Sequence, residues 1–197
     1  MKLIAAGLVC ALLFTAYSRY IIQIVRHEVA PTLSSWMMWV FATGLNVSSY
    51  LVASDQDVLS GTYLIVDAIG CVLIVGAVIL WSYQGFVLKP FERYYLMVAV
   101  GIGIFWWLSH DAFMTNVLVQ GLIALGYAPT VHNIVASKKH SESYVTWLFF
   151  LAASSVAIYL ASEGGRVLAL IYAIRGTVMI LLLLALMRMY DMINRTS

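Results

Sequence analysis

A series of long apolar runs constrains this chain more than any other feature. Seven runs cover most of the 197 residues, at about 3–25, 33–53, 58–81, 93–109, 113–136, 145–162 and 166–189. A helix that spans a bilayer needs about 20 apolar residues, because the hydrocarbon core is about 30 Å thick. Only 10% of the residues are charged, against about 25% in a soluble domain. The sequence therefore predicts an all-α membrane protein with seven transmembrane helices.

The basic residues of the connections predict the orientation. Cytoplasmic loops of membrane proteins carry an excess of Lys and Arg. The first, third and fifth connections and the C-terminus hold Arg26, Lys89, Arg93, Lys138, Lys139, Arg188 and Arg195, whereas the other side holds Lys2 and Arg166. We therefore expect the N-terminus outside or in the periplasm and the C-terminus in the cytoplasm.

The two halves of the chain align as diverged copies. Residues 20–26 (Tyr-Ile-Ile-Gln-Ile-Val-Arg) correspond to residues 127–133 (Tyr-Ala-Pro-Thr-Val-His-Asn), and Ser49-Tyr50 corresponds to Ile158-Tyr159. The run at 93–109 has no counterpart. A copy of three helices ends on the opposite side of the membrane, so one linker helix makes the two copies parallel. The predicted organisation is 3+1+3: a first repeat at 1–88, a linker helix at 89–111 and a second repeat at 112–197.

At these residues the chain resembles the PQ-loop superfamily, which includes SWEET sugar transporters, SemiSWEETs and lysosomal amino-acid exporters. The signature is split: the first copy keeps Gln23 but has Ile22 in place of proline, and the second keeps Pro129 but has Thr130 in place of glutamine. The resemblance implies a transporter that works by alternating access, with Gln23, Pro129 and Thr130 at a gate or hinge. A proline inside a helix also kinks it, because it removes one backbone hydrogen bond.

Two intramembrane charges occupy matching places in the copies. Asp67 lies in the third apolar run and Arg175 lies 108 residues later in the last. A charge inside a membrane helix is costly and faces the protein interior or a watery cavity. SWEETs carry an asparagine in this region, so the charges instead suit a zwitterionic or charged solute. Asp67 and Arg175 therefore either bind the solute or pair with each other.

Polar and aromatic residues on the second helix complete the predicted pocket. Trp39 and Asn46 are seven residues apart, hence on one face of the helix, and suit stacking and hydrogen bonding. Tyr50 and Tyr159 are equivalent residues near the outer ends of their helices, where they form either an outer gate or part of the interfacial aromatic belt.

The function expected from these features is transport of a small polar solute, such as a zwitterionic or charged metabolite, a vitamin or a sugar. The alternatives are a ligand-binding receptor similar to KDEL receptors, which share the fold, and a non-transporting membrane subunit. No Ser-His-Asp, HExxH, GxGxxG or CxxC pattern occurs, so we expect neither an enzyme nor a cofactor or metal site. The expected partners are the solute and the lipid bilayer, without nucleic acid, and a homo-oligomer remains open.

Overall fold

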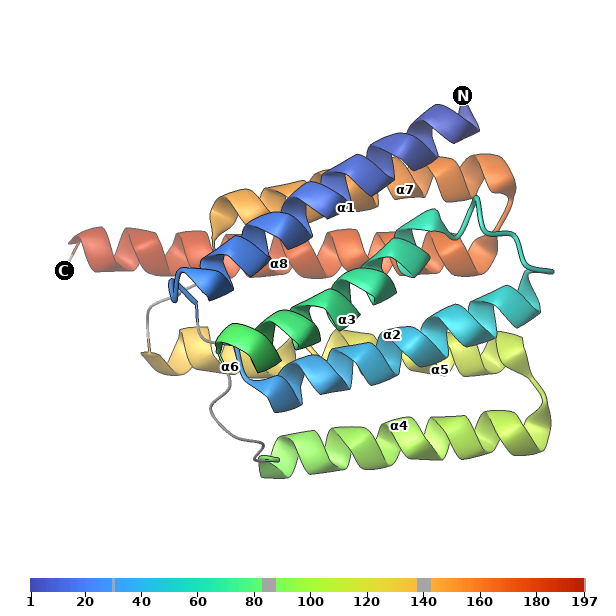
Figure 1. The fold of residues 1–197 in the computed structure, drawn as a ribbon, viewed down its shortest axis with the longest axis horizontal. Helices are drawn as coiled ribbons and strands as arrows, with labels where there is room; N and C mark the ends of the chain where they lie inside the picture. The colour runs from blue at the N-terminus through green and yellow to red at the C-terminus, as the bar shows by residue number, and fades with distance from the viewer. Residues whose placement is uncertain (30, 83–87, 138–142, 197) are drawn as a thin grey trace.

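The structure is a computed structural model that describes residues 1–29, 31–82, 88–137 and 143–196. The described chain forms eight α-helices and has no strand: α1 (Lys2–Val25), α2 (Leu33–Ala53), α3 (Thr62–Trp81), α4 (Pro90–Ser109), α5 (Ala112–Leu125), α6 (Ala128–Ser137), α7 (Tyr144–Gly164) and α8 (Val167–Thr196). The helices run side by side along one axis, and the termini lie at opposite ends of the bundle (Figure 1). Lys138 and Lys139, which contribute to the predicted charge bias, lie outside the described residues.

Five segments of the described chain are long and apolar enough to cross a membrane: α1, α3, α5 together with most of α6, α7 and α8. The prediction of an all-α membrane protein is therefore confirmed. The helices α2 and α4 have comparable lengths of 21 and 20 residues. They are not among these five segments, and each carries a polar side chain that is buried inside the bundle, Asn46 on α2 and Glu92 on α4.

Two apolar runs differ from their predicted form. The run at 113–136 is interrupted at Gly126 and Tyr127, between α5 and α6. Pro129 has no N–H to donate to the carbonyl of Leu125. Because this helical hydrogen bond cannot form, the helix is interrupted at this turn. The last helix continues to Thr196, about two turns beyond the predicted end of its apolar run.

Side-chain caps fix where several helices begin. Thr32 accepts a hydrogen bond from the Ser35 N–H at the start of α2, and Asp111 accepts one from the Met114 N–H at the start of α5. Such caps satisfy backbone donors that the first helical turn leaves free. At the start of α4, Glu92 accepts hydrogen bonds from the Lys89 N–H at 2.8 Å and from the Ser34 hydroxyl at 2.8 Å. Glu92 thereby anchors α4 to the first turn of α2.

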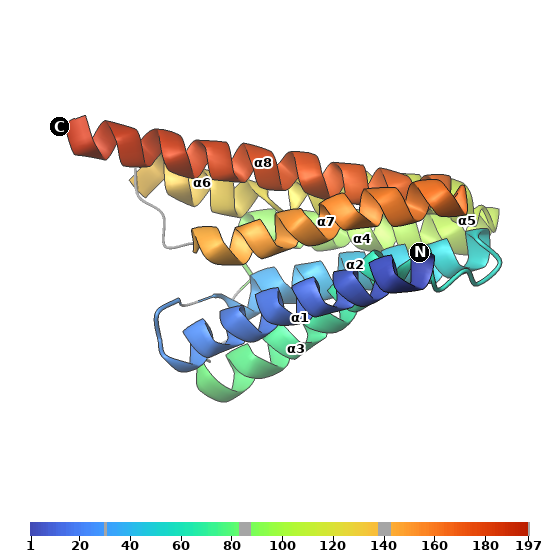
Figure 2. The same cartoon turned by 90° about the horizontal axis from the view of Figure 1, so that it is seen from above.

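The order of packing is the same in each half of the chain. In the first half α3 lies between α1 and α2, and in the second half α8 lies between α7 and the α5–α6 pair. The halves meet where α1 packs along α7 and where α2 packs along α5. Figure 2 shows α1 and α3 diverging from α7 and α8 toward the end of the bundle that holds the C-terminus. This divergence makes room for a cavity between the halves.

Candidate functional site

A cavity of about 670 Å³ lies between the two halves of the bundle. It opens beside the α1–α2 connection and the start of α4, where Thr32, Lys89 and His132 line its mouth and are exposed. It ends in the middle of the bundle, where Tyr63, Asp67, Tyr172 and Arg175 line it. Both charges singled out from the sequence are therefore part of the cavity wall.

Asp67 is held by one tyrosine from each half of the chain. The Tyr17 hydroxyl on α1 donates a hydrogen bond of 2.6 Å to Oδ1 of Asp67, and the Tyr172 hydroxyl on α8 donates to Oδ2. The same Tyr17 hydroxyl lies 3.7 Å from Sγ of Cys71, one helical turn along α3. Buried charges need such donors because they lose their hydration. Asp67 thus ties α1, α3 and α8 together at the end of the cavity.

Arg175 is held by other partners. Its Nε donates a hydrogen bond of 3.0 Å to Oε1 of Gln120 on α5, and its guanidinium carbon lies 4.6 Å from the ring centroid of Tyr172. Among the described residues no ion pair within 4.0 Å joins Arg175 to Asp67. Tyr172 lies between the two charges, since its hydroxyl contacts Asp67 and its ring contacts Arg175. In this conformation the two charges are not paired.

A buried network of amide side chains contacts Arg175 through Gln120. Gln120 donates a hydrogen bond of 2.6 Å to Oδ1 of Asn46 and one of 3.0 Å to Oδ1 of Asn116. Asn116 in turn donates to Oδ1 of Asn46 at 3.0 Å and to Ser49 at 3.0 Å. Asn46 is fully buried and does not line the cavity. It belongs to this network, which connects α2 through α5 to Arg175, whereas Trp39 lines the cavity directly.

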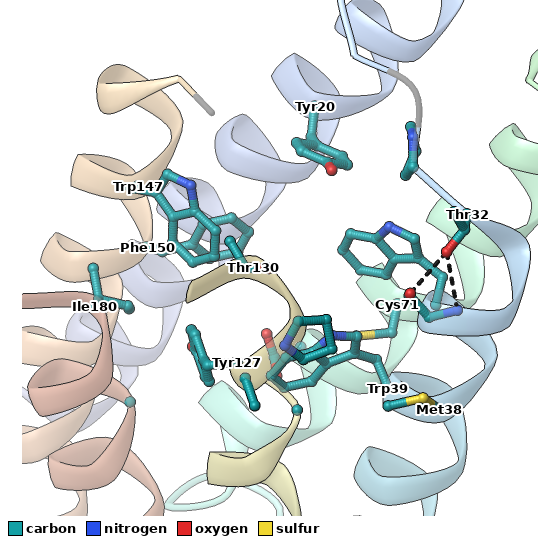
Figure 3. Close-up of a pocket in the computed structure, with 18 of the residues that line it drawn as sticks. Tyr20, Thr32, Met38, Trp39, Cys71, Tyr127, Thr130, Trp147, Phe150 and Ile180 are labelled. Carbon is teal, nitrogen blue, oxygen red and sulfur yellow. Dashed lines mark hydrogen bonds between the residues drawn. The ribbon is translucent and has the colours of Figure 1, made fainter. Parts of the chain in front are cut away.

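Aromatic rings from both halves line the cavity in contact with one another. Trp39 packs edge-on against Tyr127 at 5.1 Å between centroids, and Tyr127 lies 6.2 Å from Trp147. Trp147 lies 5.6 Å from Phe150, which packs edge-on against Tyr17 at 5.0 Å. Figure 3 shows Trp147 and Phe150 close together, with Tyr127 and Trp39 nearby on the same cavity. These five rings form a continuous chain of contacts from α2 to α1, which we call the aromatic chain.

At the opposite end of the bundle, which we call the closed end, contacts join the two halves of the chain. Asp57 in the α2–α3 connection accepts a hydrogen bond of 2.8 Å from Nε of Arg166, next to the start of α8. The Tyr50 hydroxyl donates to the backbone carbonyl of Asp57 at 3.0 Å, and the Tyr50 side chain is fully buried. Gly164 packs directly against Ser60, so that a β-carbon at Gly164 would collide with the serine hydroxyl.

The pKa of Asp57 follows from these contacts. Burial alone would raise it, but hydrogen bonds from Ser60 and Arg166 outweigh burial and lower the pKa below its ordinary value of 3.8. The same carboxylate raises the pKa of Arg166. Both groups are therefore charged at neutral pH, and they hold the α2–α3 and α7–α8 connections together.

The remaining predicted residues lie in different places. Pro129 and Thr130 line the cavity beside the break between α5 and α6. Gln23 does not line the cavity, and its buried Oε1 has no hydrogen-bond partner among the described residues. Tyr50 lies in the closed end, whereas Tyr159, its sequence equivalent, is 40% exposed. The two tyrosines are therefore in different environments.

Sequence reasoning missed the two tyrosines that hold Asp67 and the Asp57–Arg166 ion pair. Tyr17 and Tyr172 stand 50 and 105 residues from Asp67, and nothing in their local sequence distinguishes them from other membrane tyrosines. A comparison of the whole chain with models of protein families, with curated proteins and with solved structures finds no match.

Proposed function

We propose that this protein is a membrane transporter that moves a small polar solute, zwitterionic or charged, by alternating access. One observation carries the proposal: the cavity reaches exposed residues at one end of the bundle, stops at Asp67 and Arg175 in the middle, and faces a closed opposite end. Alternating access requires such a site, open to one side and closed to the other, at the interface between two repeats.

The packing order of the helices supports the 3+1+3 organisation as part of this proposal. Each half has its third helix between the first and the second, if α5 and α6 are counted as one broken helix. The contacts of α1 with α7 and of α2 with α5 pair the first helix of one repeat with the second helix of the other. A two-fold axis along the membrane normal produces this pairing of the first helix of one repeat with the second helix of the other. With α4 as linker, the chain then crosses the membrane seven times.

The distribution of charge supports an inward-facing conformation. At the open end the helix termini and connections carry four basic residues, Arg26, Lys89, Arg93 and Arg188, against the acidic Glu28, Glu92 and Asp191. At the closed end they carry two basic residues, Lys2 and Arg166, against the acidic Asp55, Asp57, Asp111 and Glu163. Because basic residues favour the cytoplasmic side, the open end is the cytoplasmic end in our proposal. The N-terminus then lies outside or in the periplasm, and the Asp57–Arg166 ion pair closes the outer side.

The change to an outward-facing conformation needs two kinds of movement. The Asp57–Arg166 ion pair must separate, and the halves must approach each other at the cytoplasmic end. The break between α5 and α6 offers a place for bending, because Gly126 and Tyr127 lack a complete set of helical hydrogen bonds ahead of Pro129. The first repeat has a continuous α1 at the equivalent position, so that bending is confined to the second repeat.

Purified protein in proteoliposomes tests the proposal. Sugars, amino acids and vitamins are first screened by thermal shift, and the compounds that stabilise the protein are then assayed for uptake. Asp67→Asn and Arg175→Gln should each weaken the shift, with Asp111→Asn at the outer start of α5 as a control that leaves it unchanged. A ligand shift that survives both substitutions would refute the charged pocket. A ligand that binds without any flux would favour the receptor alternative.

A further inference from the structure

The described contacts of Arg175 leave part of its guanidinium group without a partner. Nε is occupied by Gln120, but the two Nη nitrogens make no hydrogen bond with any side chain or backbone group that the structure describes. Arg175 lines the cavity, and its guanidinium presents a planar edge that matches a carboxylate. The anionic group of a ligand therefore has a defined position at Arg175.

Asp67 offers the complementary position for a cation. An ionised carboxylate has about four sites that accept hydrogen bonds, and the hydroxyls of Tyr17 and Tyr172 use one on each oxygen. The remaining acceptor capacity suits an ammonium group. Tyr172 alone spans the distance between Asp67 and Arg175. Both charged positions thus lie beside Tyr172 on the cavity wall, an arrangement that suits one short zwitterionic head group, in which ammonium and carboxylate share a carbon atom.

The rest of such a ligand would meet the aromatic chain. Phe150 and Tyr17 form one end of this chain, and Tyr17 is also a hydrogen-bond partner of Asp67. The aromatic chain therefore begins next to the position of the head group. Two aromatic rings prefer edge-to-face or offset-stacked arrangements, and such a pair contributes more than the burial of its surface area alone. The rings of the aromatic chain already show this geometry at Trp39–Tyr127 and Tyr17–Phe150.

We propose that the cavity binds an α-amino acid with an aromatic side chain, its carboxylate at Arg175, its ammonium at Asp67 and its ring against the aromatic chain. The inference rests on the proposed function in taking this cavity as the solute site. Neutral sugars are disfavoured, because they leave the Nη groups of Arg175 without an anionic partner. Aromatic amines without a carboxylate are disfavoured, because Arg175 repels their charge.

Equilibrium binding to the protein in nanodiscs tests this assignment. L-Phenylalanine is compared with its ring-saturated analogue cyclohexylalanine, with phenethylamine, which lacks the carboxylate, and with 3-phenylpropionate, which lacks the amine. We expect phenylalanine to bind about two- to tenfold more tightly than cyclohexylalanine. Loss of either charged group should weaken binding at least about tenfold.

Two variants locate the contacts. Arg175→Gln should remove the advantage of phenylalanine over phenethylamine, and Phe150→Leu should remove its advantage over cyclohexylalanine. Phe105→Leu is the matched control, because Phe105 lies on α4, is 37% exposed and does not line the cavity. It should leave all affinities unchanged. Equal binding of phenylalanine and cyclohexylalanine, or of phenylalanine and phenethylamine, would overturn the assignment.

Uptake into proteoliposomes separates this inference from the proposed function. Tight, ring-dependent binding of phenylalanine without uptake would uphold the inference and refute transport. Uptake of another solute, without preference for aromatic amino acids, would uphold transport and refute the inference.

Discussion

Asp57 and Arg166 are 109 residues apart in sequence and form an ion pair of 2.8 Å that joins the α2–α3 connection to the start of α8. This contact lies at the closed end of the bundle, opposite the cavity mouth, and it links the two halves of the chain. The side chain of Arg166 is 38% exposed and the side chain of Asp57 is 22% exposed. An ion pair at this position has a modest strength that depends on ionic strength, which suits the proposed alternating access, in which this contact breaks and re-forms.

Asp57→Asn should therefore shift the protein toward an outward-open conformation. Cys71, which lines the cavity, reports on this shift when Cys10 is replaced by serine. A membrane-impermeant thiol reagent added from outside should modify Cys71 faster in Asp57→Asn than in the parent, and the difference should shrink at high salt. The exchange of charges in Asp57→Arg/Arg166→Asp should restore slow modification.

Glu163→Gln is the matched control, because Glu163 is an exposed carboxylate at the same end of the bundle, close to Arg166 in sequence. It should leave the rate of Cys71 modification unchanged. Rates that are equal in the parent and in Asp57→Asn would show that the ion pair does not close the outer side.

The lowered pKa of Asp57 predicts a pH dependence of stability. A carboxylate whose pKa is lower in the folded than in the unfolded state stabilises the fold above its unfolded pKa, and this stabilisation disappears as pH falls through the folded pKa. The ordinary value is 3.8 and the folded value lies below it. The difference in melting temperature between the parent and Asp57→Asn should therefore stay constant from pH 8 to about pH 5. It should vanish once Asp57 is protonated, below pH 3.8.

The same titration on an Arg166→Gln background separates the effect of the Asp57–Arg166 ion pair from that of the other hydrogen bonds to Asp57. Without the guanidinium, the contribution of Asp57 should be smaller at every pH and should disappear at a higher pH. A stability difference that is lost between pH 8 and pH 6 instead would assign the pH dependence to another group.

The parts of the fold that follow from chain-wide physical rules were predictable. The thickness of the hydrocarbon core sets the length of the apolar runs, and six of the seven correspond to one helix each. The cost of a charge in a membrane singles out Asp67 and Arg175, both of which line the cavity. Pro129 predicts a bend, but the break itself lies upstream at Gly126 and Tyr127, where the missing hydrogen bond acts.

Contacts between segments that are far apart in the sequence could not be predicted from such rules. Tyr17 and Tyr172 hold Asp67 only because α1 and α8 both pack beside α3, and a single sequence does not reveal which helices are neighbours. For the same reason the spacing between Trp39 and Asn46 predicts that both line the pocket, whereas Asn46 lies in the network with Gln120, away from the cavity wall. Spacing identifies a shared helix face but not the group that the face meets.

Tyr17→Phe should lower the stability of the protein, because it removes a hydroxyl that donates to Asp67 at 2.6 Å while it keeps the ring. The hydrogen bond is to a buried carboxyl group in a membrane interior, so we expect a loss of about 1–2 kcal/mol in the free energy of unfolding. Denaturation in mixed micelles measures this change.

Tyr95→Phe is the matched control for that loss. The Tyr95 hydroxyl is also buried, but it has no hydrogen-bond partner among the described residues. Its removal should leave the free energy of unfolding unchanged or raise it, since no bond is broken and no polar group remains buried in its place. Equal losses in the two variants would show that the bond from Tyr17 to Asp67 contributes nothing specific.

Gly126→Ala should impair the proposed bending at the α5–α6 break without closing the cavity to ligand. A β-carbon at Gly126 would lie 3.1 Å from the carbonyl oxygen of Ile123 and 3.1 Å from Cζ2 of Trp39, so that either the helix break or the cavity wall must shift. Overpacking of this kind costs about 1–3 kcal/mol in stability. Gly121→Ala, five residues earlier on α5, would meet no atom within 4 Å and should be tolerated. The expected result is a slower uptake rate in Gly126→Ala than in Gly121→Ala, with the equilibrium affinity for ligand changed less than the rate. If both variants transport equally fast, bending at the α5–α6 break does not limit the transport cycle.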